Sequence, residues 1–183
     1  MDNDSQPGVD ELTSYLRKAR YTDDNVVILS AGDMWQGSSE SNLTYGNLTT
    51  EWMNDIGFTA MTLGNHEFDW GLDKIAKYKD GDLTNGEANF PFLGANIFYK
   101  GTNRRPDWID PYTIVDYNGL KVGIVGVVGG TQESSILALN VAEYDFLDEE
   151  TYTYQLVGSI GSDPANGKIT TEAEMTAQIV KNK

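Results

Sequence analysis

The stretch FTAMTLGNHEFD, residues 58–69, joins an apolar run to a polar end. The run that ends at Leu63 has the composition of a buried strand, and a glycine then breaks it. Asn65, His66 and Asp69 follow at once, and His66 is the only histidine in the chain. In open α/β sheets, ligands bind beyond the carboxyl ends of the strands. The stretch therefore predicts a strand whose carboxyl end presents an amide, an imidazole and a carboxylate to a site.

An upstream stretch, NVVILSAGD at residues 25–33, has the same design. Its apolar run, residues 26–29, is typical of a strand covered on both faces. Small residues follow, and then Asp33. Because the carboxyl ends of neighbouring parallel strands meet at one edge of a sheet, we expect Asp33 and the Asn65–His66 pair to reach one crevice.

The remaining pattern alternates helices and strands and then forms a hairpin. Asn118-Gly119 lies between two β-type runs and is typical of a type I′ turn. The spacing of apolar residues and the turn signals predict helices at 11–20, 40–56 and 72–78, a third strand at 89–97, hairpin strands at 111–117 and 120–128, a mixed loop at 151–168 and a helix at 171–183. This order favours an α/β fold with a central sheet.

Composition restricts the class of function. The chain has 183 residues, enough for one domain with a real core, and a formal net charge of -15. That charge argues against a nucleic-acid polymer as partner and against docking on an anionic membrane. There is no long apolar run, so membrane insertion is not expected. The absence of cysteine excludes disulfides, zinc–thiolate sites and cysteine nucleophiles.

The polar residues at the two strand ends have more than one possible role. Asp33 could supply oxygen ligands that bridge two divalent metal ions, and Asn65 could supply a neutral amide oxygen. His66 could bind a metal or donate a proton, and the carboxylate of Asp69 could hold its ring and raise its pKa. Equally, Asp33 could be a turn residue and His66 a hydrogen-bonded loop residue. Spacing alone leaves these alternatives open.

Two blocks of the sequence resemble a known family. GDMWQGS at 32–38 and TLGNHEFDWG at 62–71 resemble signature blocks of the calcineurin-like metallophosphoesterases. The version is that of the 5′-nucleotidase branch, which includes 2′,3′-cyclic nucleotide phosphodiesterases and UDP-sugar hydrolases. The resemblance covers roughly residues 10–148 of a single partial domain, with 1–9 as a polar leader and 149–183 as a loop and C-terminal helix. It implies an incomplete four-layer α/β/β/α sandwich that hydrolyses phosphate esters, nucleotides above all, through a dinuclear metal centre.

The resemblance also implies roles for individual residues. Asp33 resembles the carboxylate that bridges both metals, and Asn65 resembles the amide ligand of one metal. His66 and Asp69 resemble the catalytic dyad, with His66 off the metal and facing the phosphate. Glu67 and Phe68 are interpreted as structural, Asn96 receives no role, and the substrate-binding residues stay unidentified. The donor types admit Mn, Zn, Mg, Co or Fe.

The sequence also departs from the family pattern. The first block, Asp-x-His, is absent, as are two later histidine ligands, because His66 is the sole histidine. We therefore expect a fragment cut at both ends, without the C-terminal substrate domain, with partial or no metal occupancy and with little activity alone. The start is polar and is not a signal peptide, but the resemblance implies an extracellular, periplasmic or cell-surface protein.

Two alternative interpretations compete with the enzyme hypothesis. The chain could be a catalytically degenerate module that keeps the fold and serves in binding or structure. GIVGVVGG at 123–130 could suggest a dinucleotide site, but its glycines are spaced G-x-x-G-x-x-G and follow a hairpin turn. Gly126, Gly129 and Gly130 are instead expected to be close-packing or strand-exit residues.

Overall fold

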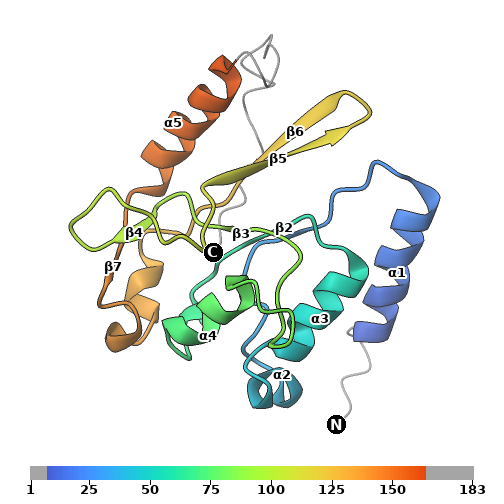
Figure 1. Cartoon of the computed structure of the whole chain (residues 1–183), viewed down its shortest axis with the longest axis horizontal. Helices are drawn as coiled ribbons and strands as arrows, with labels where there is room; N and C mark the ends of the chain where they lie inside the picture. The colour runs from blue at the N-terminus through green and yellow to red at the C-terminus, as the bar shows by residue number, and fades with distance from the viewer. Residues whose placement is uncertain (1–7, 164–183) are drawn as a thin grey trace.

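A parallel three-stranded sheet lies at the centre of the computed structural model, which describes residues 8–163 (Figure 1). Its strands are β1 (Leu29–Ser30), β2 (Ala60–Thr62) and β3 (Phe92–Leu93), in the order β1-β2-β3. β2 is buried along its whole length. The apolar runs before each polar strand end therefore form the sheet, and the expected α/β class is confirmed.

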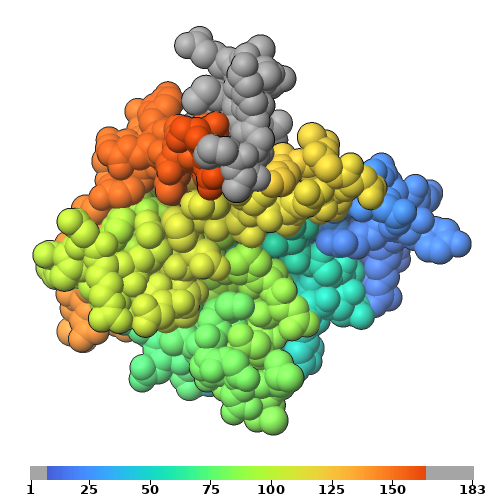
Figure 2. Space-filling view, turned by 45° about the horizontal axis from the view of Figure 1, so that its top comes forward, coloured from blue at the N-terminus to red at the C-terminus, as the bar shows by residue number. Residues whose placement is uncertain are grey.

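Helices cover one face of this sheet. They are α2 (Ser39–Leu43), α3 (Asn47–Ile56) and α4 (Leu72–Ala76), and the short helix η2 (Lys77–Lys79) continues α4. Met53 of α3, Met61 of β2 and Phe92 of β3 are fully buried in one core cluster. α1 (Val9–Thr22) has no buried residue and lies at the margin of the molecule (Figure 2).

A β-hairpin and the last described helix cover the other face of the sheet. The hairpin is β5 (Tyr112–Tyr117) and β6 (Leu120–Val125), and Ile124 packs with Ala60 and Leu93 of the sheet. α5 (Glu149–Ser162) packs against β6 (Figure 1). Helices, sheet, hairpin and α5 thus follow one another as the four layers of an α/β/β/α sandwich.

Smaller elements complete the described part of the chain. β4 (Ile97–Tyr99) pairs antiparallel with β7 (Tyr144–Phe146) beside the main sheet. Single-turn 3₁₀ helices form at η1 (His66–Phe68), η3 (Gln132–Ser135) and η4 (Ala138–Asn140). Within residues 8–163, no helix is both long and apolar enough to span a membrane.

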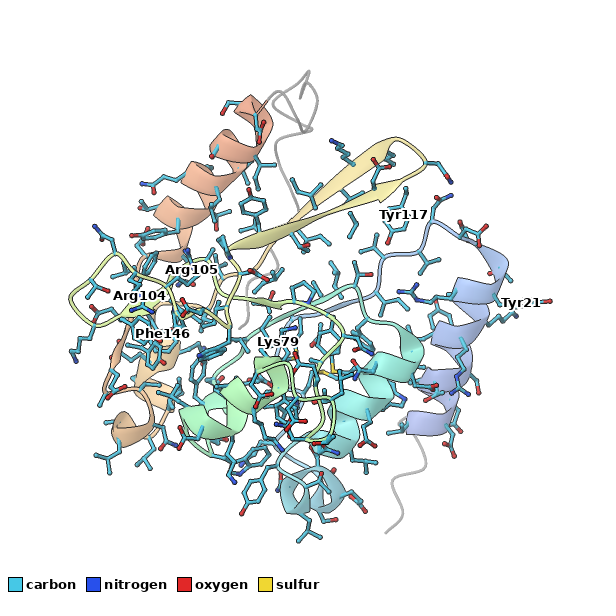
Figure 3. All side chains as sticks on the ribbon, viewed as in Figure 1. Tyr21, Lys79, Arg104, Arg105, Tyr117 and Phe146 are labelled. Carbon is cyan, nitrogen blue, oxygen red and sulfur yellow. The ribbon has the colours of Figure 1, made fainter. Side chains whose placement is uncertain are left out.

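The turn signal at Asn118-Gly119 is confirmed. Asn118 and Gly119 have φ values of 55° and 93°, as a type I′ hairpin turn requires. Gly57 ends α3 in the left-handed conformation. The hairpin is also tied to the chain leading into β1, because the Tyr117 hydroxyl donates to the Val26 carbonyl at 3.2 Å (Figure 3).

The prediction of one helix over 40–56 is wrong, because the chain breaks between α2 and α3. Tyr45 and Gly46 both have positive φ, at 51° and 83°. A Cβ at position 46 would lie 2.4 Å from the Trp35 ring, so only glycine fits this contact. The break lets the fully buried indole of Trp35 pass directly beneath the backbone.

The predicted strand at 89–97 is two strands in two sheets. β3 ends at Leu93, and β4 begins at Ile97 and pairs with β7. Between them the backbone is held by other partners: the Ala95 amide donates to the Gly126 carbonyl at 2.7 Å, and Arg105 Nε donates to the Gly94 carbonyl at 3.2 Å. The polypeptide therefore leaves the main sheet at Gly94.

The prediction that residues 26–29 are covered on both faces is wrong for Leu29. The assigned strand is only Leu29–Ser30, and Leu29 is 42% exposed. β1 is the outermost strand of the three-stranded order, so β2 is its only neighbour in that sheet.

The predicted loop at 151–168 is largely helical, because α5 spans Glu149–Ser162. The deciding signal lies just before that range: the Asp148 side chain accepts from the Thr151 amide at 2.7 Å and caps the helix. Glu149 and Glu150 in the first turn also suit the positive end of the helix dipole. The predicted helix at 171–183 and most of the polar leader, residues 1–7, lie outside the described residues.

Gly126 lies directly after β6 and meets the main sheet at close range. A Cβ built there would lie 2.4 Å from Leu93 Cβ and 2.6 Å from Thr62 Oγ1. The predicted close-packing role is therefore confirmed for this glycine. It also excludes a dinucleotide-binding turn, because the run follows an antiparallel hairpin and packs against strands.

We expect Gly126→Ala to lower the free energy of unfolding by about 1–3 kcal/mol, because the added methyl group overpacks the contact between the layers. Urea denaturation checks this. Gly123→Ala on the same hairpin is the matched control, because its Cβ would meet only Ile160 Cγ2, at 3.7 Å. Equal losses in the two variants would contradict the interpretation.

Candidate functional site

The segments that follow β1 and β2 touch each other directly. A Cβ on Gly32 would lie 2.3 Å from the Gly64 nitrogen, and a Cβ on Gly64 would lie 2.2 Å from Asp33 Oδ1. The Asp33 carboxylate accepts a hydrogen bond from the His66 backbone amide at 3.0 Å. The structure thus brings Asp33 and the segment Asn65–His66 together at one edge of the sheet, as the strand pattern predicts.

The carboxylate of Glu67 joins the two segments from the interior of the protein. One oxygen, Oε2, accepts from the Asp33 amide at 2.8 Å and the Gly64 amide at 2.7 Å. The other, Oε1, accepts from the Met34 amide at 2.7 Å. Glu67 is fully buried. Three backbone donors on one carboxylate therefore fix both segments, and the structural interpretation of Glu67 is confirmed.

The three hydrogen bonds to Glu67, called the Glu67 clamp below, hold Asp33 in an uncommon conformation. Asp33 has φ 57°, in the left-handed region that few residues other than glycine adopt. Its amide and that of Met34 both point at Glu67. Burial raises the pKa of the Glu67 carboxyl, and the three backbone donors oppose that shift by favouring the anion. The nearby charge of Asp33 raises the pKa further.

His66 and Asp69 form the predicted pair on the turn η1. The distance from His66 Nδ1 to Asp69 Oδ2 is 2.7 Å. A carboxylate can only accept a hydrogen bond, so the imidazole donates from Nδ1. The His66 side chain is 42% exposed and that of Asp69 is 21% exposed. The ring is therefore held on one side by Asp69 while part of it stays open to solvent.

The surroundings of His66 favour its charged form. The hydrogen bond to Asp69 is the main cause that raises its pKa above the ordinary value of 6.5, and partial burial opposes it. The negative charges of Asp69, Asp33 and Glu67 raise the pKa further. Such a cation can stabilise negative charge on a ligand or donate a proton to it.

The described residues contribute only part of a metal site. Asp33 has a carboxylate at this edge that can bind a hard cation, and the half-buried Asn65, which directly precedes His66 in the chain, carries a neutral amide oxygen. Across residues 8–163, no group of three or more His, Cys, Asp or Glu side chains is placed to hold a metal ion. One carboxylate and one amide do not by themselves make a two-metal centre.

Two asparagines have roles that the sequence pattern did not reveal. Asn96 is fully buried, and its amide group bonds the Val128 and Leu147 backbones, so it is a structural tie rather than a site residue. Asn140 donates from Nδ2 to the carbonyls of Phe68 and Asp69, directly behind the His66–Asp69 pair. A signal did exist for Asn140, because it is the only polar side chain in the run ILALNV, residues 136–141.

Comparison with known proteins identifies relatives of this chain. A family model described as calcineurin-like phosphoesterase matches residues 3–169. The chain is 36% identical over 152 residues to a snake venom 5′-nucleotidase of Gloydius brevicauda, and the match covers 80% of this chain and 24% of the relative. It is 34% identical over 140 residues to the cell wall protein Lmo0130 of Listeria monocytogenes, covering 70% of this chain and 18% of the relative.

Solved structures agree on the fold. The crystal structure of a 5′-nucleotidase precursor from Thermus thermophilus superposes with a TM-score of 0.69 and 26% identity, over 85% of this chain and 29% of that one. The chain thus spans about a quarter or less of the length of the two curated relatives described above. The four-layer metallophosphoesterase fold is confirmed for the part of the chain that is covered.

We expect Glu67→Gln to lower the free energy of unfolding by about 2–4 kcal/mol, because the amide NH₂ replaces an acceptor and leaves a buried backbone donor unpaired. Urea denaturation is again the measurement. Glu51→Gln is the control, because the exposed Glu51 accepts from Asn47 on its own helix. A loss of less than about 0.5 kcal/mol in Glu67→Gln would show that the Glu67 clamp is dispensable.

We expect Asp69→Asn to lower the pKa of His66, because the change removes the negative charge that strengthens the hydrogen bond to the imidazolium ion. NMR titration checks this directly, since the chain has one histidine. In linkage terms, the raised pKa stabilises the fold below the unfolded pKa, and this stabilisation is lost as pH rises through the folded pKa. An unchanged His66 pKa in Asp69→Asn would contradict the pairing.

Proposed function

Because the chain belongs to the calcineurin-like phosphoesterase family, we propose that it is part of a metal-dependent hydrolase of phosphate esters, most of all nucleotides. The observation that carries the proposal is the meeting of two strand ends. The carboxylate of Asp33 accepts from the His66 amide, and the His66 ring is held by Asp69. Metal-ligand and proton-donor side chains of the kinds this chemistry needs are thus adjacent.

His66 is the group through which the described residues act on the substrate. Asp69 fixes Nδ1, so Nε2 is the ring nitrogen free to face a phosphate. In the charged form, Nε2 carries a proton that can stabilise the negative oxygens of a transferring phosphoryl group. The same proton can pass to the leaving oxygen as the ester bond breaks. Asp69 keeps the ring oriented and stabilises its positive charge throughout.

Asp33 and Asn65 supply the metal-binding part of the proposal. The family generally uses divalent metal ions, and a dinuclear centre supplies Lewis-acid activation of phosphate and water. Asp33 would contribute the bridging carboxylate and Asn65 a neutral amide oxygen. The other donors of such a centre are not among the described residues.

Nucleotides are the proposed substrates because relatives are described as 5′-nucleotidases. Recognition of the base is assigned to a separate C-terminal substrate domain of the whole protein. An extracellular or cell-surface location is proposed on the same kind of support, since relatives include a venom enzyme and a cell wall protein.

In the full-length gene product that contains this chain, we expect His66→Ala to keep bound metal and to lower kcat on AMP by roughly 10²–10⁴-fold, because the proton donor is lost. Asp33→Ala should lose metal, measured by elemental analysis after gel filtration. Asp23→Ala is the control. Asp23 is an exposed residue directly after α1, and among the described residues its side chain accepts only from the Asn25 amide of the same turn. Metal retained in Asp33→Ala would contradict the ligand assignment.

The isolated 183-residue chain is expected to hydrolyse AMP and p-nitrophenyl phosphate poorly even with added Mn²⁺, because it has a single histidine and residues 8–163 hold no group of three or more His, Cys, Asp or Glu side chains placed to bind a metal ion. A rate comparable to that of the full-length product would overturn that expectation. If the full-length product also shows no metal-dependent hydrolysis, the degenerate-module hypothesis replaces the enzyme.

A further inference from the structure

Asn140 lies far along the chain from the His66–Asp69 pair but contacts it from behind. It ends the turn η4, and its Nδ2 donates to the Phe68 carbonyl at 2.9 Å and to the Asp69 carbonyl at 2.8 Å. We propose that Asn140 is a positioning residue that sets the orientation of Asp69 and, through it, of the His66 ring. This inference rests on the proposed function for its catalytic meaning.

The carbonyls that Asn140 binds are those at the end of a single helical turn. In η1 the Asp69 amide bonds the His66 carbonyl at 3.3 Å, and the last carbonyls of such a short turn need partners from outside it. The Phe68 carbonyl also accepts from the Gly71 amide at 3.1 Å. Asn140 is the partner that reaches both Phe68 and Asp69, so it fixes the peptide planes on each side of Asp69.

Asn140 is itself held by the core on both sides. Ile136 and Val141 are buried in the same apolar cluster as Phe68. The backbone amide of Asn140 donates to the Leu137 carbonyl at 2.8 Å. Phe68 packs edge-on against Phe146 of β7, with ring centroids 5.4 Å apart. The support behind Asp69 therefore comes from the packed interior.

The chemistry of the contact requires an amide. A single NH₂ group carries two protons and can give one to each carbonyl. Aspartate has the same shape but only acceptor oxygens, which would face two carbonyl oxygens. Alanine removes both bonds and leaves the Asp69 peptide held by the turn alone. Asn140→Asp and Asn140→Ala thus separate hydrogen-bond donation from side-chain packing.

The test uses the single imidazole as reporter. Above the His66 pKa, two-bond ¹H–¹⁵N correlations show which ring nitrogen carries the proton, and Asp69 should keep it on Nδ1. We expect the Nδ1–H fraction to fall in Asn140→Ala and Asn140→Asp. Asn54→Ala is the matched control, because Asn54 also ties a loop through its amide, to the Glu87 carbonyl and the Asn89 amide, and should leave the fraction unchanged.

In the full-length product, the same two variants at position 140 should lower kcat on AMP by roughly 10- to 100-fold while KM changes little, since the ring is misplaced and not removed. Wild-type values of both readouts in Asn140→Asp would overturn the proposal, as would an equal change of the Nδ1–H fraction in Asn54→Ala. If Asn140→Ala does not fold, judged by circular dichroism, the isosteric Asn140→Asp decides. The NMR readout needs neither substrate nor metal, so it stands even if hydrolysis is not found.

Discussion

The buried carboxylate of Glu67 is the interaction on which the site depends. A charge in an apolar interior is tolerated only when its oxygens are fully bonded, and here three backbone amides bind them. Those amides belong to the two segments that leave β1 and β2. The buried carboxylate needs all three donors, and its hydrogen bonds therefore connect two segments that lie beyond the paired residues of β1 and β2. Asp33 and His66 lie together because Glu67 lies beneath both.

The site combines opposite demands on charge. The chain carries a formal charge of -15, which repels a phosphate ester at long range. At the meeting of the strand ends, Asp69, Asp33 and Glu67 add to that negative field and raise the pKa of His66, which favours its cationic form. A negative cluster with one imidazolium ion suits bound cations first and a phosphate second. The order in which ligands are attracted thus follows from the local charges.

Patterns read along the sequence predicted the layers and the paired site residues, because both arise from local features. An apolar run before small and polar residues locates a strand end wherever it falls, and Asn118-Gly119 requires its hairpin turn. Two of the errors came from contacts between residues that are not neighbours in sequence, whereas the helix α5 was missed although its cap at Asp148 is local. Trp35 against Gly46 broke a helix, and the partners of the backbone after Gly94 divided a strand. Asn140 was missed for the same reason, because its meaning depends on a turn that precedes it by about seventy residues.

The left-handed backbone at Asp33 has a consequence for how this position can drift over evolutionary time. Beyond glycine, asparagine, aspartate and histidine are the residues most often found there, and β-branched side chains are outliers. A lineage that abandons catalysis is therefore not free to place any residue at the position. Its descendants should carry mainly glycine, asparagine or histidine in place of the acid. A restricted set of residues at this position would therefore mark where the ancestor had its carboxylate.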